Sequence, residues 1–360
     1  MDCKVEKVRE YTPYLDILRI MSAFMVVMVH VSAQEWGNVP VNSIEWQTLN
    51  VYDCLVIPSV PLFFMISGAL FLNKDYELSL KKLYLNKVLR LFVVYHVWLS
   101  FYNFLPFING ELEWTYENIK FDIIFDTLEG RGIYHLWFIP ELVIMYMITP
   151  ILREAFWKKE TCQYFLGLFF VIGTLLPAIL LYDFPYKRFV NSYFSRTSLV
   201  MLTGYIGYYV AGHYIHSFVS YELSKKWKII VGAIAILSYS VTILACSVDA
   251  LQKNEPSAIL NTPLAAPHFL TTICIFVLVR SLCKKLKVAN GSWIRILSKL
   301  SFGIYLIHPL VIDIVESLGL STIEPHPIFM VPVFGGIVFG VSVLVVFVLQ
   351  KIPGIRALVI

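Results

Sequence analysis

The sequence predicts an all-α integral membrane protein with about ten transmembrane helices and with both termini in the cytoplasm. Of its 360 residues, 58% are hydrophobic and 15% are charged, whereas about 45–50% and 25% are usual in soluble proteins. The hydrophobic residues fall in runs of roughly 17–22, the length that an α-helix needs to cross a hydrocarbon layer about 30 Å thick. Continuous apolar runs without strict alternation favour helices over a closed β-barrel.

Ten such runs follow one another along the chain, and the segments between them are too short to form a separate core. We therefore expect residues 1–360 to form a single transmembrane domain in the cell (cytoplasmic) membrane. This excludes a secreted, nuclear or cytosolic globular protein. The predicted spans are residues 15–32, 51–72, 89–107, 133–151, 164–182, 199–218, 229–247, 267–286, 301–318 and 329–350.

Lys and Arg residues gather in alternate connecting segments. With the N-terminus inside, the inner segments carry 22 of the 29 basic residues, the outer segments carry six, and Arg19 lies within the first span. Cytoplasmic loops are enriched in Lys and Arg, so this distribution predicts cytoplasmic termini. With one span more or fewer, every later connecting segment would be assigned to the other side of the membrane. The first span also resembles a signal peptide, but Asp16 and Arg19 interrupt its apolar run, and we expect it to be retained.

The cysteines show no spacing typical of a metal site or a disulfide framework. They lie mostly in or beside apolar runs, so we expect them to pack as small hydrophobic residues and we expect no bound metal. The basic residues are spread over the inner segments, which argues against nucleic-acid binding. The six cysteines are Cys3, Cys54, Cys162, Cys246, Cys274 and Cys283.

Three ionisable residues lie in the first span, namely Asp16, Arg19 and His30. Each charge at the centre of a membrane helix costs about 2.5–3.5 kcal/mol on insertion scales, so each needs a reason. His30 follows Arg19 by eleven residues. At about 100° per residue, this rotation differs from three full turns by only about 20°, so both side chains lie on one face, about 16 Å apart. Asp16, three residues before Arg19, is placed to pair with its guanidinium.

Four segments, in this order, resemble the acyltransferase-3 family of membrane O-acyltransferases, and the similarity extends over about residues 11–350. The segments are Tyr14-Leu15-Asp16-Ile17-Leu18-Arg19 followed after ten residues by His30, Pro61-Leu62-Phe63-Phe64-Met65-Ile66-Ser67-Gly68, His135-Leu136-Trp137-Phe138-Ile139-Pro140-Glu141-Leu142, and Ser301-Phe302-Gly303-Ile304-Tyr305-Leu306-Ile307-His308-Pro309.

The resemblance implies transfer of an acyl group, usually acetyl, from cytoplasmic acyl-CoA to a hydroxyl of an acceptor, commonly a cell-envelope sugar at the outer face. It makes His30 the catalytic histidine and Arg19 its partner in an Arg-x10-His motif, with Asp16 beside it. The chemistry agrees, since a hydroxyl that attacks a thioester needs a base with a pKa near neutrality. We expect a short, standalone polysaccharide O-acetyltransferase, because no soluble hydrolase-like domain follows the last span.

The sequence departs from the family pattern at Pro61, where some branches of the family, notably O-antigen acetyltransferases, carry Asp. If that carboxylate orients the histidine there, another must do so here. Asp53 and Glu141 are the candidates, because both are expected in the outer half of the membrane.

Several further residues have a functional interpretation beside a structural one. Lys87 and Arg90 can attract the phosphates of CoA, or only follow the positive-inside bias. Ser67 and Gly68 can line the donor tunnel, or pack helices closely. The candidate acceptor contacts are Glu141, Trp137, Arg196, His308 and Asp53; of these, Glu141 could only bridge helices, Trp137 could belong to an interfacial belt, and His308 could cap a helix turn.

The rival class is a polytopic transporter or flippase for a lipid-linked sugar. It would share the spans and the intramembrane charges, but inverted repeats would favour it, and the sequence has no such symmetry. Acetyl, succinyl and longer acyl donors stay open, as do the acceptor, the oligomeric state and a covalent acyl-enzyme.

Overall fold

The computed structural model describes residues 11–74, 78–197 and 202–359, and these residues form helices without a β-strand. Nine helical segments among them are long and apolar enough to cross a membrane. The expected all-α membrane fold is confirmed. The nine segments are Pro13–Ala33, Ile44–Phe71, Leu80–Ile108, Tyr116–Ala155, Lys159–Ile179, Lys225–Lys253, Ala266–Lys285, Trp293–Ser317 and Pro327–Leu349.

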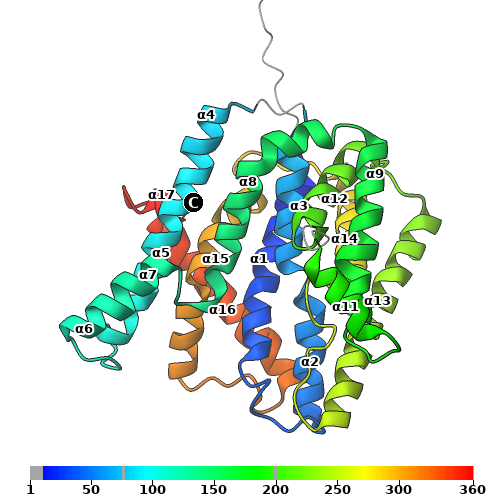
Figure 1. Ribbon diagram of the computed structural model, residues 1–360. Coiled ribbons are helices and arrows are strands. Elements are labelled where there is room, and N and C mark those ends of the chain that lie inside the picture. Colours follow the sequence, from blue (N-terminus) through cyan, green and yellow to red (C-terminus); the bar gives the residue numbers. More distant parts are fainter. Residues whose placement is uncertain (1–10, 75–77, 198–201, 360) are drawn as a thin grey trace, which may run out of the picture.

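The N-terminal half alternates long helices with short π-helical and 3₁₀ segments (Figure 1). Its elements are α1 (Pro13–Ala33), α2 (Ile44–Val56), α3 (Ser59–Phe71), α4 (Leu80–Leu83), η1 (Tyr84–Val88), α5 (Leu89–Ile108), α6 (Tyr116–Asn118), η2 (Ile119–Phe125), α7 (Asp126–Glu129), η3 (Tyr134–Trp137) and α8 (Phe138–Ala155).

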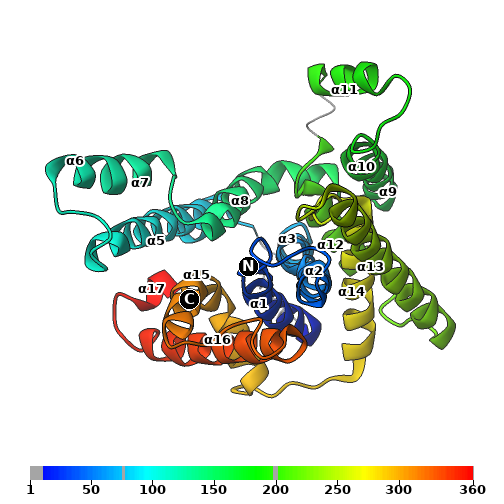
Figure 2. The same cartoon turned by 90° about the horizontal axis from the view of Figure 1, so that it is seen from below.

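The C-terminal half contains the remaining helices of the bundle and a small peripheral helix, α11, that projects from it (Figure 2). Its elements are α9 (Lys159–Leu168), η4 (Phe169–Leu175), α10 (Leu176–Ile179), α11 (Lys187–Arg196), α12 (Ile206–Phe218), α13 (Lys225–Lys253), α14 (Ala266–Leu282), η6 (Cys283–Lys285), α15 (Trp293–Ser317), α16 (Pro327–Leu349) and α17 (Arg356–Val359).

The predicted span 199–218 differs from the others. Residues 198–201 lie outside the described part of the chain, and the rest of the segment holds α12, a helix of 13 residues. At 1.5 Å per residue such a helix is about 20 Å long, short of a hydrocarbon layer about 30 Å thick. Most of its residues are buried in the bundle, so it is a core helix rather than a lipid-facing one.

Helix α12 is sheltered because it crosses α3 at very short range. A Cβ atom added at Gly68 would lie 1.8 Å from the backbone oxygen of Tyr209, and one added at Gly212 would lie 1.9 Å from that of Met65. Only glycine allows two helix backbones to approach in this way. Gly68 is therefore a packing residue of the α3–α12 crossing.

Helix α1 occupies the centre of the bundle, with α2, α3, α14, α15 and α16 packed around it (Figure 2). It begins at Pro13. Proline suits the first turn of a helix because the backbone N–H that it lacks would have no partner there. From there it runs without a break to Ala33, so the helical spacing that relates Arg19 to His30 holds in the structure.

The starts and ends of the helices gather at two opposite ends of the bundle. At one end, Arg280 near the close of α14 donates to the backbone oxygens of His216 in the last turn of α12 and of the two residues that follow this helix. Arg90 of α5 donates to the backbone oxygen of Ala357 in α17 at 3.2 Å. Although α12 is short, it therefore still returns the chain to this end of the bundle. We name this end, which holds Arg90 and Arg280, the cationic end.

At the other end, Asp53 of α2 accepts a hydrogen bond from Ser32 of α1 at 3.2 Å and another from Asn261. The hydroxyl of Tyr52 donates to the backbone oxygen of Ile328, at the start of α16. The start of α1 and the described C-terminal helix both lie at the cationic end. That this end faces the cytoplasm stays a prediction, as does the placement of Lys4, Lys7, Arg9 and Cys3, which precede the described residues.

The cysteines that the structure describes have free thiols. Cys283 is partly buried, and the others lie in the interior, where they pack as the sequence predicts. The buried ones are Cys54, Cys162, Cys246 and Cys274.

Candidate active site

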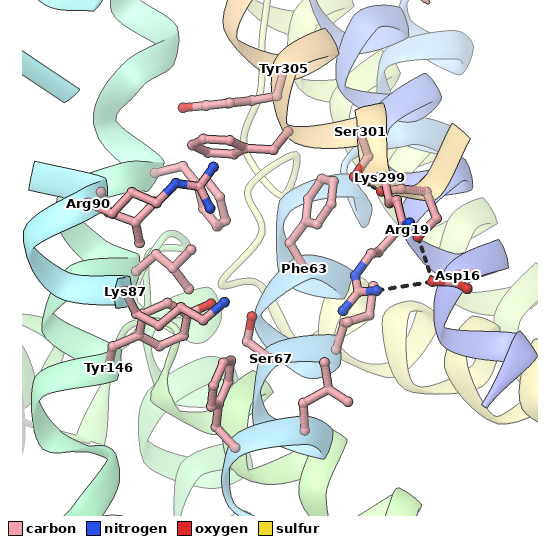
Figure 3. Close-up of a pocket in the computed structure, with 18 of the residues that line it drawn as sticks. Asp16, Arg19, Phe63, Ser67, Lys87, Arg90, Tyr146, Lys299, Ser301 and Tyr305 are labelled. Carbon is pink, nitrogen blue, oxygen red and sulfur yellow. Dashed lines mark hydrogen bonds and ion pairs between the residues drawn. The ribbon is translucent and has the colours of Figure 1, made fainter. Parts of the chain in front are cut away.

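A cavity of about 530 Å³ opens at the cationic end, and basic side chains from four elements line it (Figure 3). Helices α1, α3, α8 and α15 and the η1–α5 segment form its walls. We call it the donor cavity, after the acyl-CoA donor that the family resemblance leads us to expect. Its basic residues are Arg19, Lys87, Arg90, Arg295 and Lys299, and its polar neutral residues include Ser67, Ser298 and Ser301.

On one wall, Asp16 holds Arg19 in place. Its carboxylate lies 3.1 Å from the Arg19 guanidinium and accepts hydrogen bonds of 2.6 Å from the hydroxyls of Ser298 and Tyr11 (Figure 3). Burial and the hydrogen bond to Asp16 raise the pKa of Tyr11 to about 12, so Tyr11 stays a neutral donor at physiological pH. The Arg295 guanidinium covers the Tyr11 ring at 3.6 Å. The predicted Asp16–Arg19 pair is thus present.

On the opposite wall, Lys87 and Arg90 point into the same space. Lys87 belongs to the π-helical segment η1, and such segments recur at functional sites because the extra residue redirects a side chain. The Nε of Arg90 donates a hydrogen bond to the backbone oxygen of Ala357, whereas its buried Nη2 has no hydrogen-bond partner among the described residues. Unpaired guanidinium nitrogen in a cavity is suited to an anionic ligand.

Sequence reasoning missed Arg295 and Lys299, which it counted only as inner-loop charges. Both lie on α15, four residues apart, and α15 begins at Trp293, eight residues before the predicted span. The periodicity could have identified them, because residues 295, 298, 299, 302 and 305 are related by helical spacings of three and four and all line the donor cavity.

Aromatic rings close the deep part of the donor cavity. Phe138 packs against Phe63 at 5.8 Å and against Tyr305 at 5.5 Å between ring centroids. Tyr305 follows Arg295 by ten residues, which is about 15 Å along α15. Its hydroxyl donates to the backbone oxygen of His135 at 2.6 Å. Tyr305 therefore separates the donor cavity from the residues around His135.

Three histidines come together behind Tyr305. The rings of His30 and His308 are stacked, with centroids 5.0 Å apart and planes at 27°, and the ring of His135 lies 5.2 Å from that of His308. Tyr134 contacts His30 at 4.9 Å. We call His30, His135 and His308 the histidine cluster. It joins three of the four sequence segments that were singled out as motifs.

The histidine cluster contains unpaired polar atoms. Nδ1 of His308 donates to the backbone oxygen of Tyr305 at 2.7 Å, so its Nε2 is left as an acceptor. This Nε2 and both ring nitrogens of His135 have no hydrogen-bond partner among the described residues, although His135 is 2% exposed and His308 is fully buried. Buried polar atoms are rarely left unpaired unless a ligand or water meets them.

Other predicted site residues lie elsewhere. Asp53 bonds Ser32, which is two residues beyond His30 and about 200° around α1, so Asp53 serves the opposite side of that helix. Trp137 packs its ring on Tyr205 at 5.4 Å, and Glu141, one turn later on α8, interacts electrostatically with the same Tyr205. Arg196 ends the projecting helix α11 and is exposed (Figure 2).

No group of three or more His, Cys, Asp or Glu side chains with a geometry suited to a metal ion occurs among residues 11–74, 78–197 and 202–359. The histidine cluster is thus an arrangement of rings in contact rather than a set of converging ligands.

Comparison with known families settles the class of the protein. The model of an acyltransferase domain, that of the acyltransferase-3 family, matches residues 12–351, nearly the whole chain. The chain belongs to this family. Together with its long apolar helices, this makes the chain a multi-pass membrane protein of that family, and the four sequence segments that resemble the family lie within the matched range.

A curated relative from Enterococcus faecalis, named as an amino-acid racemase, is 25% identical to the chain over 328 residues. The match covers 85% of this chain and 42% of that protein, so the chain spans less than half the length of this relative. No solved structure gives a significant match.

Proposed function

We propose that the protein moves an acyl group, most simply acetyl, from cytoplasmic acyl-CoA to a hydroxyl of a cell-envelope sugar or polysaccharide. The observation that carries this proposal is the continuity of α1. One uninterrupted helix presents Arg19 to the donor cavity and His30 to the histidine cluster, about 16 Å apart on one face.

The donor cavity suits a polyanion. Coenzyme A carries about four negative charges, and five basic side chains surround the cavity. The extended pantetheine arm is comparable in length to the distance between Arg19 and His30. A nucleotide bound among Arg19, Lys87 and Arg90 would direct its thioester past Phe138 and Tyr305 toward His30.

In the proposed reaction the acceptor oxygen attacks the thioester carbon while His30 accepts the hydroxyl proton. A C–O bond forms, the C–S bond breaks, and the proton then passes from His30 to the departing sulfur. The products are the acyl ester of the acceptor and free CoA thiol. Histidine is suited to both transfers because its usual pKa lies near neutrality.

In this proposal the other partners are the lipid bilayer of the cell membrane and an envelope glycan. The long helices leave large apolar side chains exposed on their outer faces, as on α13 and α16, and a hydrocarbon layer would cover them.

The test is product detection with purified protein in detergent or vesicles, radiolabelled acetyl-CoA and candidate envelope glycans. The proposal predicts release of CoA thiol together with label in an alkali-labile ester of the glycan. A carrier or flippase for a lipid-linked sugar would move the glycan without releasing CoA thiol, so uptake without ester formation would replace this proposal by the transporter.

A further inference from the structure

A second cavity, of about 410 Å³, lies at the other end of α5 from the donor cavity. Its lining includes Tyr102 and Asn103 near the close of α5, Asp122 of η2, Asp126 of α7, and Tyr134. Arg90 at the start of α5 lines the donor cavity, and the 12 residues from Arg90 to Tyr102 span about 18 Å of helix. The two cavities therefore approach the middle of the protein from different ends.

Two walls of this second cavity are also walls of the histidine cluster. The ring of Tyr134 lies 4.9 Å from that of His30, and the ring of Tyr102 lies 5.2 Å from that of His135. Tyr102 is itself fixed, because its hydroxyl donates to the backbone oxygen of Leu306 at 2.7 Å. A molecule in the second cavity is thus separated from His30 by a single ring, that of Tyr134.

The charge of this cavity is opposite to that of the donor cavity. No Lys or Arg is among its lining residues, whereas Asp122 and Asp126 are, four residues apart. The surrounding segment 109–132 contains six carboxylates and only two basic residues, and one of these, Arg131, is paired with Glu129. A negative field of this kind repels a polyanion such as CoA and attracts a cation.

The unpaired nitrogens of the neighbouring histidine cluster indicate which ligand chemistry suits this side of the site. His135 and His308 are at most 2% exposed, and together they leave three ring nitrogens unpaired among the described residues. A hydroxyl group both donates and accepts a hydrogen bond, so it can satisfy a neutral imidazole whichever nitrogen carries the proton. The three histidines do not line the second cavity, so this match concerns a ligand hydroxyl that reaches past Tyr134 to the histidine cluster.

We propose that the second cavity receives the acceptor, and that this acceptor is a polyhydroxylated molecule with a positive charge or no charge rather than an acidic glycan. The inference rests on the proposed acyl transfer and adds the place and the charge class of its second substrate. Asp122 and Asp126 select the acceptor by charge. The amide nitrogen of Asn103 already donates to Thr127 and to the backbone oxygen of Arg131, so Asn103 offers its amide oxygen as an acceptor.

The experiment uses three acceptors that differ mainly in charge: choline glucoside, methyl glucoside and methyl glucuronide. The quaternary ammonium of choline cannot itself be acylated. The purified full chain receives acetyl-CoA with each acceptor, and CoA thiol and the acylated sugar are both quantified. The variants are Asp122→Asn with Asp126→Asn, a surface control Glu255→Gln, which is exposed and lies outside segment 109–132, and His30→Ala.

We expect kcat/KM to be at least about tenfold higher for choline glucoside than for methyl glucuronide, with methyl glucoside between them. The double Asn variant should reduce this ratio to within about twofold, and Glu255→Gln should leave it unchanged. The wild-type ranking is informative even if the double variant fails to fold.

Equal use of the acidic and the cationic acceptor by the wild-type protein would overturn the inference, and so would a charge preference that persists in the folded double variant. Transfer that depends on His30 would meanwhile still support the proposed function. If no acceptor gave His30-dependent release of CoA thiol, the proposed function itself would fall and the inference with it.

Discussion

Arg19 and His30 share one face of α1 but have different surroundings. Arg19 lies beside a carboxylate, two hydroxyl donors to that carboxylate and an open cavity, whereas the ring of His30 packs against the rings of Tyr134 and His308. Helical spacing alone predicted that the two residues are aligned. It could not predict His135 as the third ring of the cluster, because the contact joins η3 and α15, which are far apart in the chain.

The basic residues of the donor cavity lead to a prediction at the residue scale. Replacing Lys87 or Arg90 by Gln should raise KM for acetyl-CoA about three- to tenfold with a smaller change in kcat, because each loses one charged contact with a phosphate. The difference from wild type should shrink in high salt, which screens the wild-type attraction. Steady-state kinetics at two ionic strengths checks this.

Lys81→Gln is the matched control, since Lys81 lies on exposed α4 and does not line the donor cavity. Unchanged KM in both cavity variants, or an equal rise in the control, would mean that these residues follow only the positive-inside bias.

At the scale of elements, the crossing of α3 and α12 concerns two predictions from the sequence, namely the role of Ser67-Gly68 and the span 199–218. Close packing was one of the two interpretations of Ser67-Gly68, and Gly68 indeed touches α12, while Ser67 lines the donor cavity. The apolar run 199–218 has the composition of a span. Its length in helical conformation depends on where the helix begins, which hydropathy does not define.

This crossing predicts that Gly68→Ala or Gly212→Ala destabilises the protein by about 1–3 kcal/mol, since the added methyl group forces two backbones apart. Thermal unfolding in detergent should show a lower Tm for both variants. Gly232→Ala and Gly336→Ala are matched controls, because an added Cβ there meets no atom within 4 Å. Equal Tm values in all four variants would show that the crossing tolerates more space than its geometry indicates.

At the scale of the whole molecule, the alternation of basic segments and the position of the cavities agree. The charge pattern predicted which ends of the helices lie together, and Arg19, Lys87, Arg90, Arg295 and Lys299 do line one cavity. The second cavity could not be predicted, because its walls come from the end of α5 and from the irregular segment 119–134, whose path follows from tertiary packing rather than from periodicity.

The opposite placement of the two cavities predicts that the substrates enter from different sides. In sealed vesicles of uniform orientation, acetyl-CoA supplied only on the side of the N-terminus should acylate an acceptor confined to the other side. Acetyl-CoA on the acceptor side alone should give background levels. A requirement for both substrates in one compartment would contradict the two-sided arrangement, even with His30 as the base.

The central claim is that His30 performs acyl transfer at the junction of the two cavities. The most direct measurement compares the rate of acetyl transfer in a single turnover between wild type, His30→Ala and His96→Ala, with folding and membrane insertion verified for each. His96 lies on α5 and lines neither cavity. A general base contributes about 10²–10⁴-fold, so we predict a loss of that size for His30→Ala and a wild-type rate for His96→Ala. A wild-type rate in correctly inserted His30→Ala protein would contradict the account.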